Sequence, residues 1–222
     1  MADRARRMKV RVKDARKSAS SRRWLERQLN DPYVARAKRE GYRSRAAYKL
    51  QEIARSDHLI TPGMTVVDLG AAPGGWSQVA AERVGSNGRV IAVDLLEMPP
   101  LRTVVFIQGD FREEETVARM EAELKGALVD LVLSDMAPNM SGIAVSDQAR
   151  VVHLAELALD FAVKWLKPEG NFLVKTFQGV GFPELRDAMR GHFRQLVTRK
   201  PRASRGRSSE IYLLGKGLSR RS

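Results

Sequence analysis

The sequence contains no cysteine, and this absence excludes several kinds of chemistry. A chain without thiols forms no disulfide, builds no zinc site on cysteine and has no thiolate nucleophile. Chains without disulfides are typical of reducing compartments. We therefore expect a cytoplasmic protein whose chemistry uses other side chains.

Long apolar runs are also absent. No segment approaches the roughly 18 consecutive apolar residues that cross a bilayer, so we expect no membrane partner. The N-terminus, "MADRARRMKVRVKDARKS", lacks the apolar core of a secretory signal. Its arginines leave a mitochondrial presequence open, but Asp3 and Asp14 are atypical of one. We prefer a nucleic-acid-binding arm.

Two common phosphate-binding motifs are missing as well. The chain has a glycine turn, "GAAPGG" at residues 70–75, between an apolar segment and a helical pattern. The turn matches neither the G-x-G-x-x-G dinucleotide fingerprint nor the G-x-x-x-x-G-K-[ST] P-loop. Glycines allow positive φ angles or a close approach of the backbone to a ligand. A turn of this kind can also serve helix packing alone.

Positive charge is plentiful, and it is concentrated at the two ends of the chain. The net charge is +13, made up of +8 in residues 1–30, +4 in 31–49, +7 in 198–222 and −6 in 50–197. Trp24, Tyr33 and Tyr42 lie among the N-terminal basic residues, whereas purely solvating tails contain few aromatics. The pattern favours a surface that binds RNA or DNA over a pair of solvated tails.

Short apolar runs alternate with helical patterns through the middle of the chain. The runs have the fully buried character of parallel strands and span residues 64–69, 89–95, 103–108, 128–135 and 170–177. Helices are expected at 44–56, with Ser44 as N-cap, and at 76–84, 113–124, 147–166 and 183–190. The last runs, 194–200 and 210–216, are close enough to form a hairpin.

This order predicts an α/β fold of the Rossmann-like type. We expect a mostly parallel seven-stranded sheet with one antiparallel strand and helices on both faces. In domain terms, residues 1–30 form a basic, partly flexible extension, residues 31–218 form the folded domain, and residues 219–222 form a C-terminal tail.

An aspartate stands at the carboxyl end of each of the first four expected strands: Asp68, Asp94, Asp110 and Asp135. In open α/β sheets, ligands bind at this edge. Unpaired buried acids are costly, so packing alone does not explain four of them. Asp94 is placed to accept hydrogen bonds from ribose hydroxyls, and Asp110 from an exocyclic amine. These acids suit an adenosine whose nearest charge is a cation, as in S-adenosylmethionine.

Several motifs give the chain a specific resemblance. They are "YRSRAAYKLQEI", "DLGAAPGGWSQ", "DLLEMPP", "QGDFRE", "SDMAPNMSG", "VKTFQG" and "SSEIYLLG". With these motifs the chain resembles the FtsJ/RrmJ (RlmE) family of S-adenosylmethionine-dependent RNA ribose 2′-O-methyltransferases, from about Trp24 to Gly215. The resemblance implies that Gly74, Trp76, Asp94, Asp110 and Asp135 contact the cofactor, and that no metal is required.

The resemblance also implies a catalytic Lys-Asp-Lys-Glu tetrad at Lys49, Asp135, Lys175 and Glu210. Adjacent strands are about 4.8 Å apart, so Lys175 and Asp135 can converge on one oxygen. We expect Lys175 to be the base, or the cation that stabilises the developing alkoxide. Lys49 and Glu210 would orient Lys175 and the ribose.

Each of these residues also has an ordinary structural interpretation. From the sequence alone, Lys49 reads as a surface lysine on a helix and Glu210 as an acid on an edge strand. Trp76 fits helix packing as well as cofactor contact. Lys175 is harder to explain structurally, because "FLVKTF" places it at the end of an apolar strand.

The expected acceptor is a ribose oxygen. Methylation at carbon 5 of a pyrimidine ordinarily needs a thiolate, which this chain lacks. Amine methylation usually shows an [N/D/S]-P-P-[Y/F] turn, where this chain has D-M-A-P. The resemblance implies a uridine of large-subunit ribosomal RNA, in the assembled subunit, as the target. We expect a monomeric enzyme.

Two alternatives remain open at this point. One is a 2′-O-methyltransferase of another RNA, such as a tRNA or an mRNA cap. The other is a non-catalytic RNA-binding factor for ribosome assembly.

Overall fold

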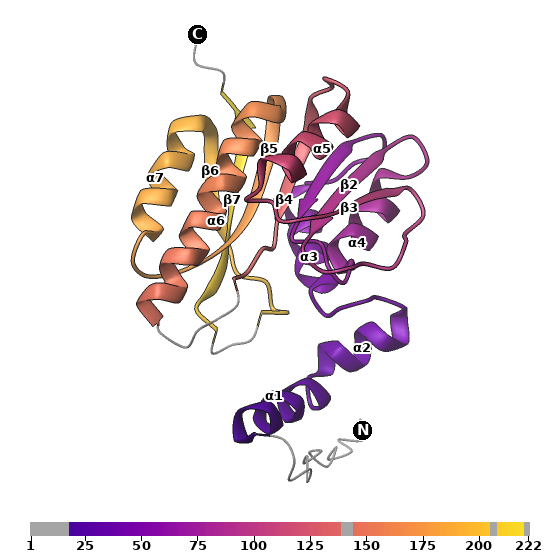
Figure 1. Ribbon diagram of the computed structural model, residues 1–222, viewed down its shortest axis with the longest axis vertical. Coiled ribbons are helices and arrows are strands. Elements are labelled where there is room, and N and C mark those ends of the chain that lie inside the picture. Colours follow the sequence, from indigo (N-terminus) through magenta and orange to yellow (C-terminus); the bar gives the residue numbers. More distant parts are fainter. Residues whose placement is uncertain (1–17, 139–143, 205–207, 220–222) are drawn as a thin grey trace.

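One seven-stranded sheet organises the protein in the computed structural model, which describes residues 18–138, 144–204 and 208–219 (Figure 1). The strands are β1 (Thr65–Leu69), β2 (Arg89–Asp94), β3 (Val104–Gln108), β4 (Val129–Ser134), β5 (Leu166–Phe177), β6 (Phe193–Arg199) and β7 (Glu210–Leu218). Their order across the sheet is β3-β2-β1-β4-β5-β7-β6. Only β7 runs against the others, pairing antiparallel with both β5 and β6. The expected mixed seven-stranded sheet is confirmed.

Helices cover both faces of this sheet. Those that do so are α3 (Ala47–Asp57), α4 (Gly75–Val84), α5 (Glu114–Leu124), α6 (Ala144–Trp165) and α7 (Phe182–His192), whereas α1 (Ala19–Leu29) and α2 (Pro32–Glu40) lie beyond the end of the sheet (Figure 1). The apolar residues of α3 and α4 pack on one face of the sheet, and those of α5, α6 and α7 pack on the other. Side chains alternate between faces along a strand; accordingly, Val66 joins the α3–α4 core and Val67 the opposite core.

Two features of the N-terminal third differ from the sequence-based expectations. Helix α3 begins at Ala47 and has no side-chain cap, so the prediction of Ser44 as its N-cap is wrong. Residues 44–46 instead form a turn, in which the Ala47 amide donates to the Ser44 carbonyl. Helices α1 and α2 were not predicted. Each has an N-cap that its sequence supplies, Ser18 for α1 and Asp31 for α2.

The carboxyl ends of the parallel strands meet at one edge of the sheet, toward the bottom of Figure 1. Helices α1 and α2 lie on the same side of the molecule (Figure 1).

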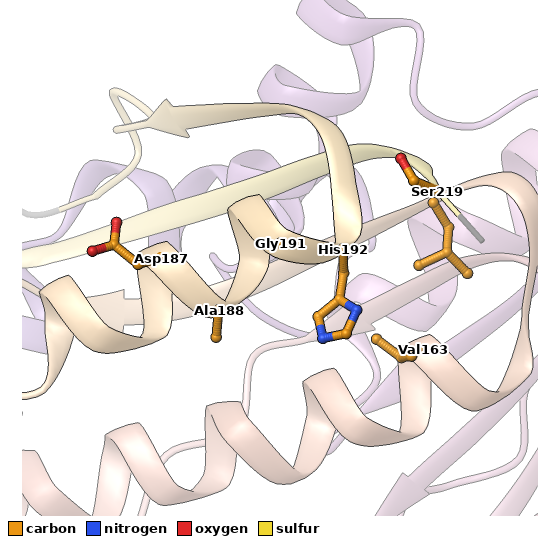
Figure 2. Close-up of a pocket in the computed structure, with 7 residues that line it drawn as sticks. Val163, Asp187, Ala188, Gly191, His192 and Ser219 are labelled. Atoms are coloured by element: carbon orange, nitrogen blue, oxygen red, sulfur yellow. The ribbon is translucent and has the colours of Figure 1, made fainter. Parts of the chain in front are cut away.

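A cavity of about 570 Å³ lies at the opposite edge of the sheet, where α7 ends (Figure 2). It is lined by Val163, Asp187, Ala188, Gly191, His192, Leu218 and Ser219. None of the residues expected to bind or react lines this cavity.

In the part of the chain that the structure describes, no helix is long and apolar enough to cross a membrane.

Candidate active site

Strand alternation brings three polar side chains under α3. On β5, Leu173 packs in the α3–α4 core, and Lys175 lies two residues further along the same face. Lys175 is paired with Tyr212 across the β5–β7 ladder. Glu210 lies two residues before Tyr212 and therefore faces the same way. All three are near the carboxyl edge of the sheet, where α3 places Lys49 above them.

These side chains form a connected series of close contacts. The Lys49 Nζ lies 2.7 Å from Glu210 Oε1 and 3.1 Å from Tyr212 Oη. The Tyr212 hydroxyl lies 3.1 Å from Asp135 Oδ1. The Lys175 Nζ lies 3.0 Å from the same Asp135 oxygen and 2.5 Å from the Asp135 carbonyl oxygen. The structure thus brings together all four residues of the expected tetrad.

Burial makes these interactions stronger than ordinary surface ion pairs. The side chains of Lys49 and Glu210 are 11% and 13% exposed, and those of Lys175 and Asp135 are 8% and 17% exposed. Removing one member of such a pair leaves a poorly solvated charge, which typically costs about 3–5 kcal/mol. Glu210 has a further partner, because the Ser204 hydroxyl donates to its Oε1 at 2.9 Å.

Tyr212 joins the two ion pairs and was missed by the sequence analysis. Its ring is fully buried and packs on Trp76, with ring centroids 5.6 Å apart. Burial, together with the charges of Asp135 and Glu210, raises the pKa of Tyr212 well above its ordinary value. The phenol therefore keeps its proton, donates to Asp135 and accepts from Lys49. Only the long-range β5–β7 register reveals this role.

The glycine turn lies directly beside this cluster. Gly70 and Gly74 have positive φ angles of 79° and 103°. A Cβ atom on Gly70 would lie 2.7 Å from Met136 Cγ, and one on Gly74 would lie 2.8 Å from Arg43 Nη1. Any side chain at either position would therefore clash as well as strain the backbone.

Asp94 is oriented by the backbone of the loops around it. Its Oδ2 accepts from the Ala72 amide at 2.9 Å, and its Oδ1 accepts from the Leu96 amide at 2.8 Å. Each carboxylate oxygen has a second lone pair. Two acceptor positions therefore remain for a ligand at this edge of the sheet.

Asp110 is held differently, by a neighbouring arginine. The Arg112 Nε lies 2.9 and 3.0 Å from the two Asp110 oxygens, and Arg112 Nη2 also donates to Oδ2. The hydrogen bond from Arg112 holds the pKa of Asp110 below its ordinary value. A ligand that uses this carboxylate must share it with Arg112, whose side chain is 58% exposed.

Asp68 is the most deeply buried acid of this edge. It is fully buried, and its Oδ2 accepts from the Ser77 hydroxyl at 2.6 Å. Its Oδ1 has no hydrogen-bond partner among the residues that the structure describes. Burial raises the pKa of Asp68 to about 7; the hydrogen bond from Ser77 opposes this rise, while the charges of Asp135 and Asp94 add to it. At neutral pH this carboxyl group is therefore partly protonated.

The Trp76 side chain is part of the core. It is 2% exposed, and its indole N–H donates to the Ala46 carbonyl at 2.9 Å. Any contact of Trp76 with a cofactor would therefore use its backbone, at the first turn of α4. Within the "SDMAPNMSG" motif, residues 139–142 lie outside the described residues.

The geometry defines a class of protein: a Rossmann-like α/β protein whose carboxyl edge carries acids, a glycine turn and a buried lysine–carboxylate cluster. The family model for FtsJ-like methyltransferases matches residues 42–218. The chain therefore belongs to the FtsJ-like methyltransferase family. As a member of it, the chain is an enzyme that transfers a methyl group.

Curated relatives and a solved structure agree with this assignment. The Methylobacillus flagellatus protein named ribosomal RNA large subunit methyltransferase E is 62% identical, with 88% of this chain and 95% of that protein covered. The Nitrosospira multiformis protein of the same name is 61% identical, with coverage of 91% and 98%. A crystal structure of a Plasmodium falciparum protein described as a ribosomal RNA methyltransferase has a TM-score of 0.72 at 30% identity, with coverage of 81% and 100%.

Proposed function

We propose that this enzyme methylates the 2′-hydroxyl of a ribose in large-subunit ribosomal RNA, with S-adenosylmethionine as methyl donor. The observation that carries the proposal is the cluster of Lys175, Asp135, Tyr212, Lys49 and Glu210 at the edge of the sheet that holds the glycine turn. The relatives' names supply the RNA class. Following the resemblance, we propose a uridine of the assembled large subunit as the acceptor.

The residues present suit S-adenosylmethionine. The glycine turn follows β1 at the carboxyl edge with positive φ angles at Gly70 and Gly74, and Asp94 keeps two acceptor positions at this edge. Asp94 would hold the ribose hydroxyls and Asp110 the adenine amine. Asp94, which forms no ion pair within the described part of the chain, suits a ligand with positive charge. When bound, the cofactor would supply an electrophilic methyl group on a sulfonium.

Lys175 would act on the proton of the ribose 2′-hydroxyl. In its ammonium form Lys175 has three donors; one is bonded to the Asp135 carbonyl, and the Asp135 carboxylate lies 3.0 Å away as an ion-pair partner. A remaining donor is available for the 2′-oxygen, where it would stabilise the alkoxide that forms when the hydroxyl proton passes to water. If Lys175 is instead neutral, it would accept the proton itself. Both routes need Asp135 to fix the lysine in place.

Lys49, Glu210 and Tyr212 would position this pair. Tyr212 donates to the same Asp135 oxygen that Lys175 contacts, and Lys49 holds the Tyr212 hydroxyl. A carboxylate held from two sides has little orientational freedom. It therefore keeps Lys175 in one position, which favours a single alignment of the acceptor with the methyl group.

The two N-terminal helices would form a positively charged surface that the RNA contacts. They lie on the side of the active edge (Figure 1) and belong to the segment that carries much of the positive charge. Phosphates would bind this surface without sequence preference and bring a ribose to Lys175. We further propose that the enzyme is a monomer and works in the cytoplasm.

Mapping of 2′-O-methyl groups on ribosomal RNA, from cells with and without the gene for this protein, tests the proposal. We expect one large-subunit ribose to lose its methyl group when the gene is absent and to regain it on complementation. If the missing group belongs to a tRNA or an mRNA cap, the RNA class is wrong. If no RNA changes, the non-catalytic alternative is favoured.

A further inference from the structure

The connector between α2 and α3, residues 41–46, lies against the first turn of α4, directly after the glycine turn. The Gln78 side chain is bonded to the connector twice, accepting from the Arg43 amide at 2.7 Å and donating to the Gly41 carbonyl at 3.0 Å. The indole of Trp76 holds the far end of the connector at Ala46. The Arg43 backbone is therefore fixed relative to α4.

The Arg43 guanidinium reaches from this fixed point to two loops. Its Nη1 donates to the Pro99 carbonyl at 2.6 Å, and its Nη2 donates to the Pro100 carbonyl at 2.8 Å. Nη1 also lies 3.4 Å from the Pro73 carbonyl in the glycine turn. Pro99 and Pro100 belong to the loop at residues 95–103, which follows Asp94. One planar group thus joins the glycine turn to the loop on the other side of the expected cofactor site.

Several facts indicate that this contact shapes the site. Leu95 and Leu96, at the start of the loop, are 58% and 68% exposed, whereas Met98 is buried with Ala71 of the glycine turn, so Arg43 adds polar contacts to an apolar one. The Leu96 amide is one of the two donors that orient the Asp94 carboxylate. The other donor, the Ala72 amide, lies in the glycine turn next to Pro73. Arg43 therefore connects the two segments that together hold Asp94.

We propose that Arg43 is a positioning residue for the cofactor: it holds the loop at residues 95–103 against the glycine turn and so sets the affinity for the adenosine part of the methyl donor. This role rests on the proposed function for the identity of the donor. Lysine cannot replace arginine here, because one ammonium cannot donate in a plane to carbonyls of two separate loops. The same connector leads into α3, which carries Lys49.

The test compares Arg43→Lys and Arg43→Gln with the wild-type chain. S-adenosylmethionine binding is measured by calorimetry, and methylation of large ribosomal subunits is measured at limiting and saturating cofactor. Without the hydrogen bonds to Pro99 and Pro100, the loop must be ordered when the cofactor binds, so we expect the cofactor Kd to rise about tenfold in both variants. The KM for the cofactor should rise similarly, while kcat stays near the wild-type value because Lys175 and Asp135 are unchanged.

Arg89→Lys is the matched control. The Arg89 guanidinium also donates to a carbonyl of another element, that of Glu123 at 2.7 Å, but β2 places it at the opposite edge of the sheet. We expect this control to change thermal stability about as much as Arg43→Lys and to leave cofactor affinity unaltered. Hydrogen exchange without ligand should become faster at residues 95–103 in the Arg43 variants and not in the control.

An unchanged cofactor Kd in a folded Arg43→Gln protein would overturn the positioning role and leave the proposed function standing. Equal losses of affinity in the Arg43 variants and in Arg89→Lys would also overturn it, since they would reflect general destabilisation. Failure of the wild-type chain to bind S-adenosylmethionine would overturn the proposed function and this role together.

Discussion

At the scale of single residues, side chains of the same type have different roles in the site because their neighbours differ. Lys175 and Lys49 are both buried lysines, yet Lys175 contacts the carboxylate and carbonyl of Asp135, whereas Lys49 contacts Glu210 and Tyr212. The resemblance supplied all four members of the tetrad. Tyr212 was not predicted, because a tyrosine in an apolar strand reads as core until its hydroxyl is placed by the partner strand.

Replacing Lys175 should affect the chemical step more than binding. We expect Lys175→Ala to lower the single-turnover rate about 10²–10⁴-fold, with cofactor and RNA affinity nearly intact. Lys175→Arg should not rescue if the lysine accepts the proton, because a guanidinium does not release its proton near neutral pH. Partial rescue by arginine would indicate charge stabilisation instead, and a near wild-type rate in Lys175→Ala would make the lysine structural.

The two acids expected to hold adenosine should differ in their contributions. Asp94 keeps open acceptor positions, whereas Asp110 is already engaged by Arg112. We therefore expect Asp94→Ala to weaken S-adenosylmethionine binding by about tenfold or more, and Asp110→Ala to weaken it less. Calorimetry on both variants checks this order. Wild-type affinity in both would remove the two residues from the cofactor site.

Asp68 should make the stability of the protein depend on pH. Its pKa is about 7 in the folded chain, against about 3.9 in an unfolded one. Its stabilising contribution is therefore complete below about pH 4 and is lost as pH rises to about 7, because only the unfolded chain gives up the proton in that window. Relative to Asp68→Asn, the wild type should lose up to about 4 kcal/mol between pH 4 and 8.

Denaturant unfolding of both proteins across this range measures the difference. Asp160→Asn, at an exposed position of α6, serves as the control and should show no such trend. A pH-independent difference between wild type and Asp68→Asn would mean that Asp68 is ionised throughout.

At the scale of elements, strand and helix patterns predicted most of the fold but not the N-terminal helices. The five apolar runs and the final hairpin correspond to β1–β7, because buried strands carry a strong apolar signal. The apolar signal of helices α1 and α2 is weaker. Among the described side chains of α2, only Ala37 is buried, and the segment is dominated by charge. The packing of Tyr33 and Tyr42 against Tyr48 of α3 involves contacts that no local pattern encodes.

The basic N-terminal segment should act through phosphates. A chain that begins at Ser18 keeps the N-cap of α1 but loses a net charge of +6. We expect it to bind RNA more weakly and with a shallower dependence of log K on log salt, because fewer counterions are released. Its cofactor affinity should not change. Binding measured over a salt series checks this, and equal slopes for the two chains would show that residues 1–17 make no phosphate contacts.

At the scale of the whole molecule, the charge distribution and the sheet topology indicate the same functional surface. The carboxyl edge of the sheet collects the glycine turn, the acids and the lysine cluster, and the basic N-terminal helices lie on that same side (Figure 1). The edge could be predicted because parallel strands share one carboxyl end. The residues that link its parts, such as Arg43 and Tyr212, could not be predicted, because they join segments far apart in the sequence.

The most direct test of this account uses purified protein and large ribosomal subunits from cells that lack the enzyme. The subunits are incubated with S-adenosylmethionine labelled in its methyl group, and the RNA is digested to nucleosides. We predict label in one 2′-O-methylated nucleoside, a uridine, with wild-type protein, and at least about 100-fold slower labelling with Lys175→Ala. Label on a base, or no label with the wild-type protein, would contradict the account.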